Sequence, residues 1–400
     1  MAIILVLVIL LFYILTDKAI LLPQNVNNLL SQNAYVFVLA VGMLLCILTG
    51  GNIDLAVGSV VCFAGAIGGV ILDKDINFVV AALAVLAIGA LVGMWQGFWI
   101  AYVNVPPFIA TLAGMYAFRG LSNVVLKGQV IGLNKKTAFL NVFGGGADCY
   151  IPDLFHGENM NITCLIAGLI GIAIYVIMTV KGRINSKKRG YETPALGGEV
   201  AKMVIISAVV LYVTLKLAKY QGIPTSFLWV LLVVLVFGYV TQKTRIGRYL
   251  YAVGGNKKAA QLSGIDVKKV YFFAYSFMGL LSGLAGILTI ARAAGAQPTF
   301  GQGYEMDAIG ACFIGGASAY GGIGTVPGVI IGAILMGVIN QGMSIYGLNA
   351  NYQKIVKGVV LLGAVLVVAR MDAVGQVCTV CMQFVCQRNQ RDQRIQVQFL

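Results

Sequence analysis

A succession of apolar runs extends along the whole 400-residue chain, and no other feature constrains the fold as strongly. Because a helix needs about 20 apolar residues to cross a membrane, this succession predicts an all-α polytopic membrane protein with about ten to twelve transmembrane helices. Several later runs are too short or too rich in glycine for a simple spanning helix, which predicts broken or re-entrant segments. The runs lie near residues 2–15, 34–49, 54–72, 78–103, 107–125, 162–180, 201–219, 226–240, 270–290, 306–320, 327–346 and 353–370.

The composition excludes the soluble classes of protein. Hydrophobic residues make up 59% of the chain and charged residues 10%, whereas soluble domains carry roughly a quarter charged residues. A soluble enzyme, a nucleic-acid-binding protein and a disordered chain are therefore excluded. A channel, a transporter or an intramembrane enzyme remains. The 50 glycines and 8 prolines suit close packing and interruption of membrane helices.

The cationic residues gather in two stretches. The chain has 28 Lys and Arg against 14 Asp and Glu, a formal net charge of +14, and many of these cations lie within residues 181–189 and 243–269. By the positive-inside rule, both stretches face the cytoplasm. Counting crossings from them places both termini in the cytoplasm and the polar segment 126–163 outside it.

These assignments predict one transmembrane domain at residues 1–370, with an extracytoplasmic loop at 126–163 and a cytoplasmic loop at 241–269. A divergent cytoplasmic tail, rich in Gln, Arg and Cys, follows at residues 371–400. The first apolar run has no basic segment before it, so we interpret it as a first helix without its usual flank rather than as a signal peptide.

Few residues could carry catalysis or hold a cofactor. The chain has one histidine, His156, and no G-x-x-x-x-G-K-[ST] phosphate loop. Cys378 and Cys381 form a C-x-x-C pair, but zinc normally takes four ligands and His156 is expected on the opposite side of the membrane. The sequence therefore predicts no catalytic residue, no metal site and no cofactor.

A helix break is predicted between the second and third apolar runs. Gly50 and Gly51 can end the preceding helix with positive φ, and Asp54 can cap the following helix by accepting its free N–H groups. Asn52 lies between them. Two interpretations stay open: a tight turn at the membrane interface, or an unwound segment that lines a transport path.

A second glycine-rich tract covers residues 310–332, just after Glu305 and Asp307. Carboxylates are costly in lipid, so we expect these two to face water, a cavity or a helix N-terminus; as first-turn residues they would need no function. Gly279 with Gly283, and Gly328 with Gly332, are small-xxx-small pairs. They predict close packing of helices within the subunit or across a dimer.

The cytoplasmic loop contains a complete short helix. Asn256 is a suitable N-cap and Gly264 a suitable end, which predicts about two turns between them. So short a helix is unstable alone and should be docked. It could rest on the protein's own helix ends or on anionic lipid, or it could be a coupling helix that binds a cytoplasmic partner.

Four stretches together resemble the permease subunit of bacterial ABC-type monosaccharide importers, within the ribose-type permease superfamily. They are GGNIDLAVGS, MWQGFWIAYVNVPPFIATLAGMYAFRGL, RIGRYLYAVGGNKKAAQLSGI and MDAIGACFIGGASAYGGIGTVPGVIIGAILMGVINQGMSIYGL. The FGGG and IPDLF segments of the outer loop resemble the xylose or multiple-sugar branch. The resemblance covers roughly residues 20–368. The missing basic start and the tail after about Val368 depart from the family pattern, and we interpret them as a truncated start and a divergent or frame-shifted end.

The resemblance implies a pore subunit of the bacterial inner membrane, without enzymatic activity, in a fold similar to that of the vitamin B12 importer. It implies a homodimer that works with nucleotide-binding cassette ATPases and an extracytoplasmic sugar-binding protein, surrounded by membrane lipid and without nucleic acid. The 126–163 loop would meet the binding protein. The ATPase-coupling residues would be Asn256, Ala259, Ala260, Leu262, Ser263, Gly264 and Ile265.

A neutral sugar would meet aromatic and polar side chains, because amides both donate and accept hydrogen bonds. The candidates are Asn52, Asp54, Trp95, Gln96, Trp99, Asn104, Thr111, Asn340 and Gln341. The same side chains could instead bond to neighbouring helices. The alternative function is an ion-coupled secondary sugar transporter, which needs a buried titratable group. Asp54, Glu305, Asp307 and Arg119 could supply it.

Overall fold

A computed structural model describes residues 2–146, 148–155, 157, 160–190 and 196–366 of the chain. Its first half contains α1 (Ala2–Leu15), the 3-10 turn η1 (Ala19–Leu21), α2 (Pro23–Gln32), α3 (Ala34–Leu48), α4 (Val57–Asp73), α5 (Phe78–Ala101), α6 (Pro107–Leu126) and α7 (Thr137–Phe143). Its second half contains α8 (Ile162–Lys188), α9 (Leu196–Ala218), α10 (Thr225–Lys243), α11 (Arg245–Gly255), α12 (Lys257–Leu262), α13 (Val267–Arg292), α14 (Tyr304–Ile314) and α15 (Val326–Ile345). Residues 350–366 are helical as well. The strands β1 (Ile131–Gly132) and β2 (Gly295–Ala296) pair antiparallel.

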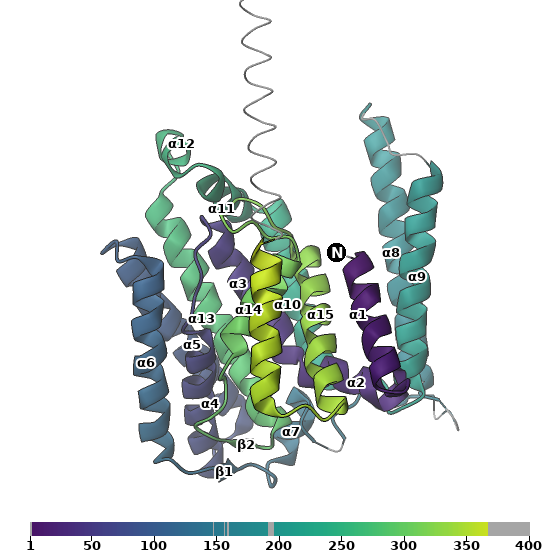
Figure 1. The fold of residues 1–400 in the computed structure, drawn as a ribbon, viewed down its shortest axis with the longest axis horizontal. Coiled ribbons are helices and arrows are strands. Elements are labelled where there is room, and N and C mark those ends of the chain that lie inside the picture. The colour runs from purple at the N-terminus through teal and green to yellow at the C-terminus, as the bar shows by residue number, and fades with distance from the viewer. Residues whose placement is uncertain (1, 147, 156, 158–159, 191–195, 367–400) are drawn as a thin grey trace, which may run out of the picture.

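The helices form a packed body and a separate hairpin (Figure 1). In the body, α13 packs against α5, α3 and α4, while α14 packs against α15 and α3. The α8–α9 hairpin lies to one side and reaches the body mainly through α2. Its helices are as apolar as those of the body but almost wholly exposed, as expected of surfaces that face lipid.

The innermost helix is α3, in which every residue except Tyr35 is buried. Its sequence AYVFVLAVGMLLCIL is apolar on all sides, which is typical of a helix enclosed by others. The helix begins after a 42° bend that separates it from α2. The bend leaves Tyr35, in the first turn of α3, partly exposed.

The predicted all-α membrane fold is confirmed. Among the described residues, seven helices are long and apolar enough to cross a membrane, and the bent α2–α3 pair makes an eighth candidate. The described residues also contain two shorter apolar helices, α1 and α4, and a further helix at residues 350–366. Helix α14 has 11 residues, about 17 Å, and cannot cross a hydrocarbon layer of about 30 Å alone.

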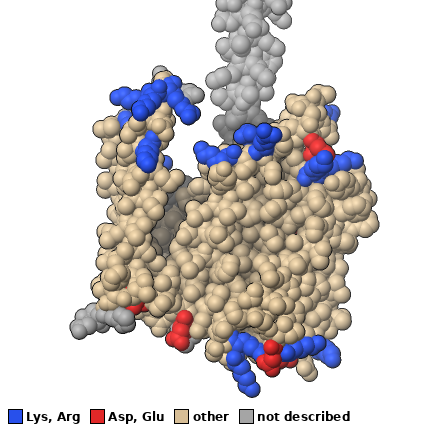
Figure 2. Space-filling view, turned by 180° about the vertical axis from the view of Figure 1, so that it is seen from behind, with Lys and Arg blue, Asp and Glu red and all other residues tan. Residues whose placement is uncertain are grey.

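The two cation-rich stretches lie at the same end of the molecule. Figure 1 places the end of α8 and the α11–α12 loop at the top, and α7, β1 and β2 at the bottom. Most charged side chains at the upper end in Figure 2 are Lys and Arg, with one acidic group beside them, whereas cationic and acidic side chains lie together at the lower end. Residues 181–189 and 243–269 therefore share one end of the molecule, and α7 with the small sheet lies at the other. The tail at 371–400 and His156 lie outside the described residues.

Candidate substrate pathway and coupling surface

The predicted break between α3 and α4 is present at residues 49–56. Gly50 and Gly51 have φ of +125° and +75°, conformations that favour glycine. The prediction that Asp54 caps α4 is wrong, because Ala56 occupies the N-cap position and α4 has no side-chain cap. Asp54 lies two residues earlier, is 1% exposed, and accepts the N–H of Ala56 at 2.8 Å in a local turn.

This break packs against the glycine-rich turn between α14 and α15. The N–H of Gly322 donates to the Leu48 carbonyl at 3.2 Å, and a Cβ at Gly51 would collide with the carbonyl of Ala319. Asn52 donates to the hydroxyl of Thr49 at 3.0 Å. The break after α3 and the turn between α14 and α15, which are far apart in the sequence, therefore contact each other. A Cβ at Gly254 of α11 would collide with the Leu48 carbonyl, so this contact adjoins the end of the molecule that carries α11 and α12.

A second junction joins the start of α4 to the loop before α14. Gly58 and Gly301 are in backbone contact, and a Cβ at either residue would collide with the carbonyl of the other. Arg119 of α6 fixes the same loop, because its Nη1 donates to the carbonyls of Phe300 at 2.5 Å and Pro298 at 3.4 Å. The N-termini of α4 and α14 meet here, and Glu305 in the first turn of α14 complements their positive dipole ends.

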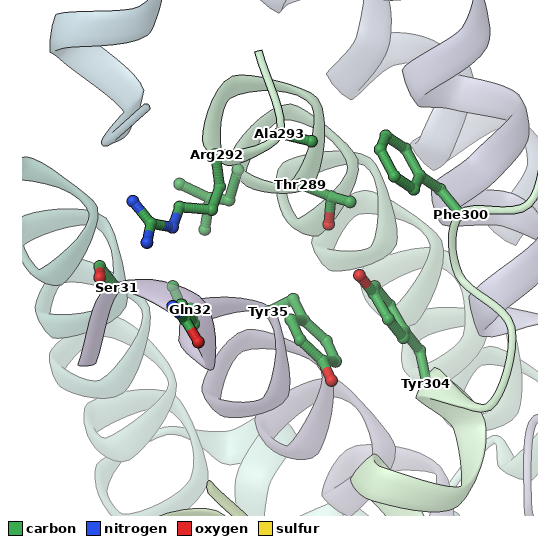
Figure 3. Close-up of a pocket in the computed structure, with 10 residues that line it drawn as sticks. Ser31, Gln32, Tyr35, Thr289, Arg292, Ala293, Phe300 and Tyr304 are labelled. Carbon is green, nitrogen blue, oxygen red and sulfur yellow. The ribbon is translucent and has the colours of Figure 1, made fainter. Parts of the chain in front are cut away.

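A pocket of about 130 Å³ is lined in part by Phe300 of the same loop (Figure 3). The rings of Tyr35 and Tyr304 stack at 3.7 Å between centroids and form one wall, with Phe300 beside them. Its polar lining is supplied by Ser31, Gln32, Thr289 and Arg292. Aromatic faces and neutral donors suit a polyhydroxy molecule, but ordinary small-molecule pockets measure about 300–1,000 Å³. The pocket has room for about four water molecules, or for part of a sugar.

Sequence reasoning missed this pocket. Tyr35 and Tyr304 lie 269 positions apart within or beside apolar runs, and no local pattern indicates that their rings stack. Arg292 gives a weak signal, since it is a cation at the end of a long apolar run. It contacts Asn28 of α2 at 3.5 Å across the pocket edge.

Asp307 is the centre of a buried polar cluster. It lies in the first turn of α14, as predicted, and is 1% exposed. Lys357 Nζ lies 2.9 Å from its Oδ1 and 3.1 Å from its Oδ2. The hydroxyl of Tyr35 and the amide of Asn340 donate to Oδ2 at 2.8 Å and 3.4 Å. Asp307 therefore lies at a helix N-terminus, one of the three surroundings expected for it, and also faces a cation that was not expected. Lys357 was not among the predicted site residues.

The candidates on α5 and α6 divide into inner and outer groups. Gln96 and Thr111 are 1% and 0% exposed, and Thr111 donates to the Pro107 carbonyl at 2.9 Å. Among the described residues, Gln96 Nε2 has no hydrogen-bond partner. Trp95 and Trp99 instead lie on the outer side of α5, 44% and 39% exposed.

The remaining candidates are separated from these groups. Asn104 lies between α5 and α6 with φ of +63° and donates to the Tyr102 carbonyl at 3.5 Å. Gln341 donates to the Asn25 carbonyl at 2.6 Å and so joins α15 to α2. The structure therefore brings Asn340 to Asp307, and Gln96 towards α6, but it does not gather the predicted residues at one point.

The short helix predicted between Asn256 and Gly264 is present as α12 and projects from the top of Figure 1. Asn256 caps it by accepting the N–H of Ala259 at 3.0 Å, and Gly264 follows it with φ of +81°, as predicted. Ala260 is buried against the protein, whereas Leu262 is 90% exposed. The helix thus rests on its own protein through one face and presents a large apolar side chain on the other.

The opposite end carries α7, the small sheet and a structured turn. Asp153 accepts the N–H groups of Gly157 at 3.0 Å, Ile162 at 3.1 Å and Thr163 at 3.1 Å. These donors, with Gly157 the strongest, hold the pKa of Asp153 well below its ordinary range. The 126–163 segment therefore includes a preorganised surface rather than a plain linker.

The part of the chain that the structure describes contains five of the eight cysteines. No group of three or more His, Cys, Asp or Glu side chains there could hold a metal ion. The five cysteines described there are free and buried. The C-x-x-C pair at Cys378 and Cys381 lies outside that part.

Comparison with known proteins agrees with the motifs. Residues 25–365 match the family described as the permease component of the branched-chain amino acid transport system. The chain is 36% identical over 354 residues to the xylose transport system permease protein XylH of Escherichia coli strain K12, with 88% of this chain and 86% of the relative covered. XylH of Haemophilus influenzae is 37% identical over 359 residues, with 88% and 91% covered. The ribose import permease protein RbsC of E. coli K12 is 36% identical over 345 residues, with 86% and 85% covered. No solved structure matches the chain.

Nearly the full length of each relative is aligned, and the aligned region contains both helix junctions and the α12 loop. Together with the apolar helices, this similarity identifies a multi-pass protein of the inner membrane. The chain belongs to the permease family of ABC-type monosaccharide importers.

Proposed function

We propose that this chain is the pore subunit through which a pentose or a related monosaccharide crosses the bacterial inner membrane. Two kinds of relative support the substrate class, since their names specify xylose and ribose, both neutral five-carbon sugars. Permeases of this family work with a separate ATPase and a substrate-binding protein. The chain itself is not an enzyme, and ATP hydrolysis takes place on the other subunit.

The observation that carries the proposal is the exposed α12 helix. Leu262 is 90% exposed at the cation-rich end, and both ends of α12 are defined by local capping. An apolar side chain presented on a short docked helix suits a groove in a protein partner. The helix adjoins α11, whose Gly254 packs on the end of α3 beside the break at 49–56. Motion of a bound ATPase would therefore reach that break directly.

The substrate pathway is proposed to run along the break at residues 49–56 and the glycine-rich tract 310–332. Trp95 and Trp99 belong to this proposal although they lie on the outer side of α5. Polar substrate cannot travel against lipid, so a pathway lined by these residues requires a second copy to enclose it. This argument favours the homodimer that the family resemblance implies.

The distribution of Lys and Arg supports an orientation of the chain in the membrane. The end that carries residues 181–189 and α12 is proposed to face the cytoplasm. The crossing count made from the sequence proposes the same side for both chain termini. The end that carries residues 126–163 is then extracytoplasmic and would receive the sugar-binding protein. The exposed apolar sides of α8 and α9 would contact membrane lipid.

The ion-coupled alternative receives no support from the carboxylates. Asp307 is already paired with Lys357, and Asp54 accepts a backbone N–H beside a helix break. A neutral sugar path does not need a titrating group. The pairing of Asp307 with Lys357 instead leaves these two side chains without a net charge.

The test is affinity purification of the tagged chain from its native membrane in mild detergent, followed by mass spectrometry. We expect a cassette ATPase to copurify with the unmodified chain and to be lost when residues 259–264 are replaced by a flexible linker. Uptake of radiolabelled xylose or ribose should stop when cells are depleted of ATP. Recovery of the chain alone, with uptake that survives ATP depletion, would establish the secondary transporter instead.

A further inference from the structure

The ion pair of Asp307 and Lys357 has no role in the function proposed above, yet it is the best-buried charge pair in the described residues. The side chains of Asp307 and Lys357 are 1% and 21% exposed. Taking a single charge out of water costs several kcal/mol, and the cost is recovered only with a close partner and further hydrogen bonds. Each charge is therefore tolerable at this depth because the other is present.

The cluster connects four elements. Asp307 belongs to α14, Tyr35 to α3, Asn340 to α15 and Lys357 to the helix at residues 350–366. Three donors from three helices thus converge on one carboxylate. Such an arrangement fixes the rotation of α14 about its own axis more strictly than apolar packing would, because hydrogen bonds are directional.

Tyr35 links this cluster to the pocket of Figure 3. Its ring stacks on Tyr304 at 3.7 Å and an interplanar angle of 15°, while its hydroxyl donates to Asp307 at 2.8 Å. Tyr304 precedes Asp307 by one helical turn. Displacing the carboxylate would therefore displace both rings of the wall that Figure 3 shows.

The helix at residues 350–366 is otherwise loosely attached. Four of its apolar residues pack on the core, namely Val360, Leu361, Ala364 and Val365, but most of its side chains are exposed. Lys357 is the polar attachment of this helix to the buried cluster. Lys354, one turn earlier on the same helix, is exposed, and no ion pair with it is recorded among the described residues.

We propose that Lys357 is a positioning residue for translocation. Its ion pair with Asp307 holds the first turn of α14, and with it the Tyr35–Tyr304 wall, in the geometry that sugar passage requires. The proposal rests on the proposed sugar-import function for its transport readout. Its structural part, the clamp between α14 and the last helix, can be measured without any transport.

The experiment compares Lys357→Met, Asp307→Asn, the double variant and Lys357→Arg, with Lys354→Met as the matched control. Uptake is measured in cells with the complete transporter and normalised to folded permease in the membrane. Each single neutralisation leaves one charge unpaired, so we expect a fall of about tenfold or more in maximal uptake at an unchanged half-saturating sugar concentration. The double variant and Lys357→Arg should recover to within about threefold of the unmodified chain.

Thermal unfolding of the tagged permease in detergent provides the second readout. The single variants should unfold at a lower temperature than the double variant, and Lys354→Met should match the unmodified chain. A Lys357→Met variant that equals the control in both measurements would overturn the clamp, as would a double variant no better than the singles. If stability follows this pattern but uptake per folded molecule is unchanged, the pair is structural and the positioning role fails. ATP-independent uptake by the unmodified chain would contradict the proposed function and leave the stability comparison intact.

Discussion

Gly93 of α5 and Gly279 of α13 face each other so closely that neither can carry a side chain. A Cβ added at Gly93 would lie 2.8 Å from the Cα of Gly279, and one added at Gly279 would lie 2.5 Å from the Cα of Gly93. Gly279 and Gly283, the pair predicted to allow close helix packing, therefore make this contact within the subunit. Gly283 continues the same contact one turn further on, against Gly89.

Gly279→Leu should separate α5 from α13 and destabilise the fold. Backbone atoms cannot move aside as flexible side chains do, so the cost should be about 3 kcal/mol or more. The measurement is thermal unfolding of the purified chain in detergent. Gly238→Leu on α10 is the control, because a Cβ there meets nothing within 4 Å. Equal unfolding temperatures for the two variants would show that the α5–α13 contact is looser than described.

Leu262→Asp should weaken the association with the ATPase without affecting the fold. The side chain is 90% exposed, so its loss removes no internal packing. A central apolar anchor in a protein interface typically accounts for about tenfold or more in affinity. The amount of ATPase retained after affinity purification measures the effect. Leu154→Asp, at an exposed position at the opposite end, should retain the ATPase fully.

Arg119→Met should loosen the loop at residues 297–303. The guanidinium donates to the carbonyls of Phe300 and Pro298, and a methionine leaves both without that donor. We expect sugar uptake per folded molecule to fall by about tenfold, and Arg119→Lys to recover part of it because one ammonium can reach a single carbonyl. Tyr116→Leu, exposed on the same helix, is the control. Uptake unaffected by Arg119→Met would show that these two hydrogen bonds are not needed for transport.

The hydrogen bonds to Asp153 predict that the stability of its turn in the 126–163 loop depends on pH. Hydrogen bonds from Gly157, Thr163 and Ile162 lower the pKa of its carboxyl, so the charged form is favoured in the folded loop. The stabilisation is present at neutral pH and is lost as the pH falls through the lowered pKa. Amide hydrogen exchange at residues 157, 162 and 163, corrected for the intrinsic pH effect, should stay slow from pH 7 to about pH 4.

The variant Asp153→Asn tests the same turn at constant pH. The amide keeps one acceptor oxygen where the carboxylate has two, so exchange at these positions should accelerate at pH 7. Asp148→Asn in the same loop should leave the exchange rates at residues 157, 162 and 163 unchanged. Loss of protection in the unmodified chain already near pH 5 would show that the carboxylate is not held by these donors.

Several parts of the molecule could be predicted because their signals are local. Apolar length indicates membrane helices, and the glycines at 50 and 51 indicate the break between α3 and α4. Asn256 and Gly264 define α12 through contacts with their own neighbours in sequence. Asp54 was misassigned by two residues, since an acidic side chain near a helix start can serve either a cap or a preceding turn.

The class of fold, the family and the position of the short helix α12 could be read from the sequence, because hydropathy, capping and motif order are properties of contiguous residues. Which helices become neighbours was apparent only in three dimensions. The tertiary structure joined Lys357 to Asp307 across 50 positions and Tyr35 to Asp307 across 272, and it set Gly279 against Gly93. Ion pairs and close backbone contacts depend on distances in space, and a chain of mainly apolar helices offers many pairings that no local pattern can distinguish.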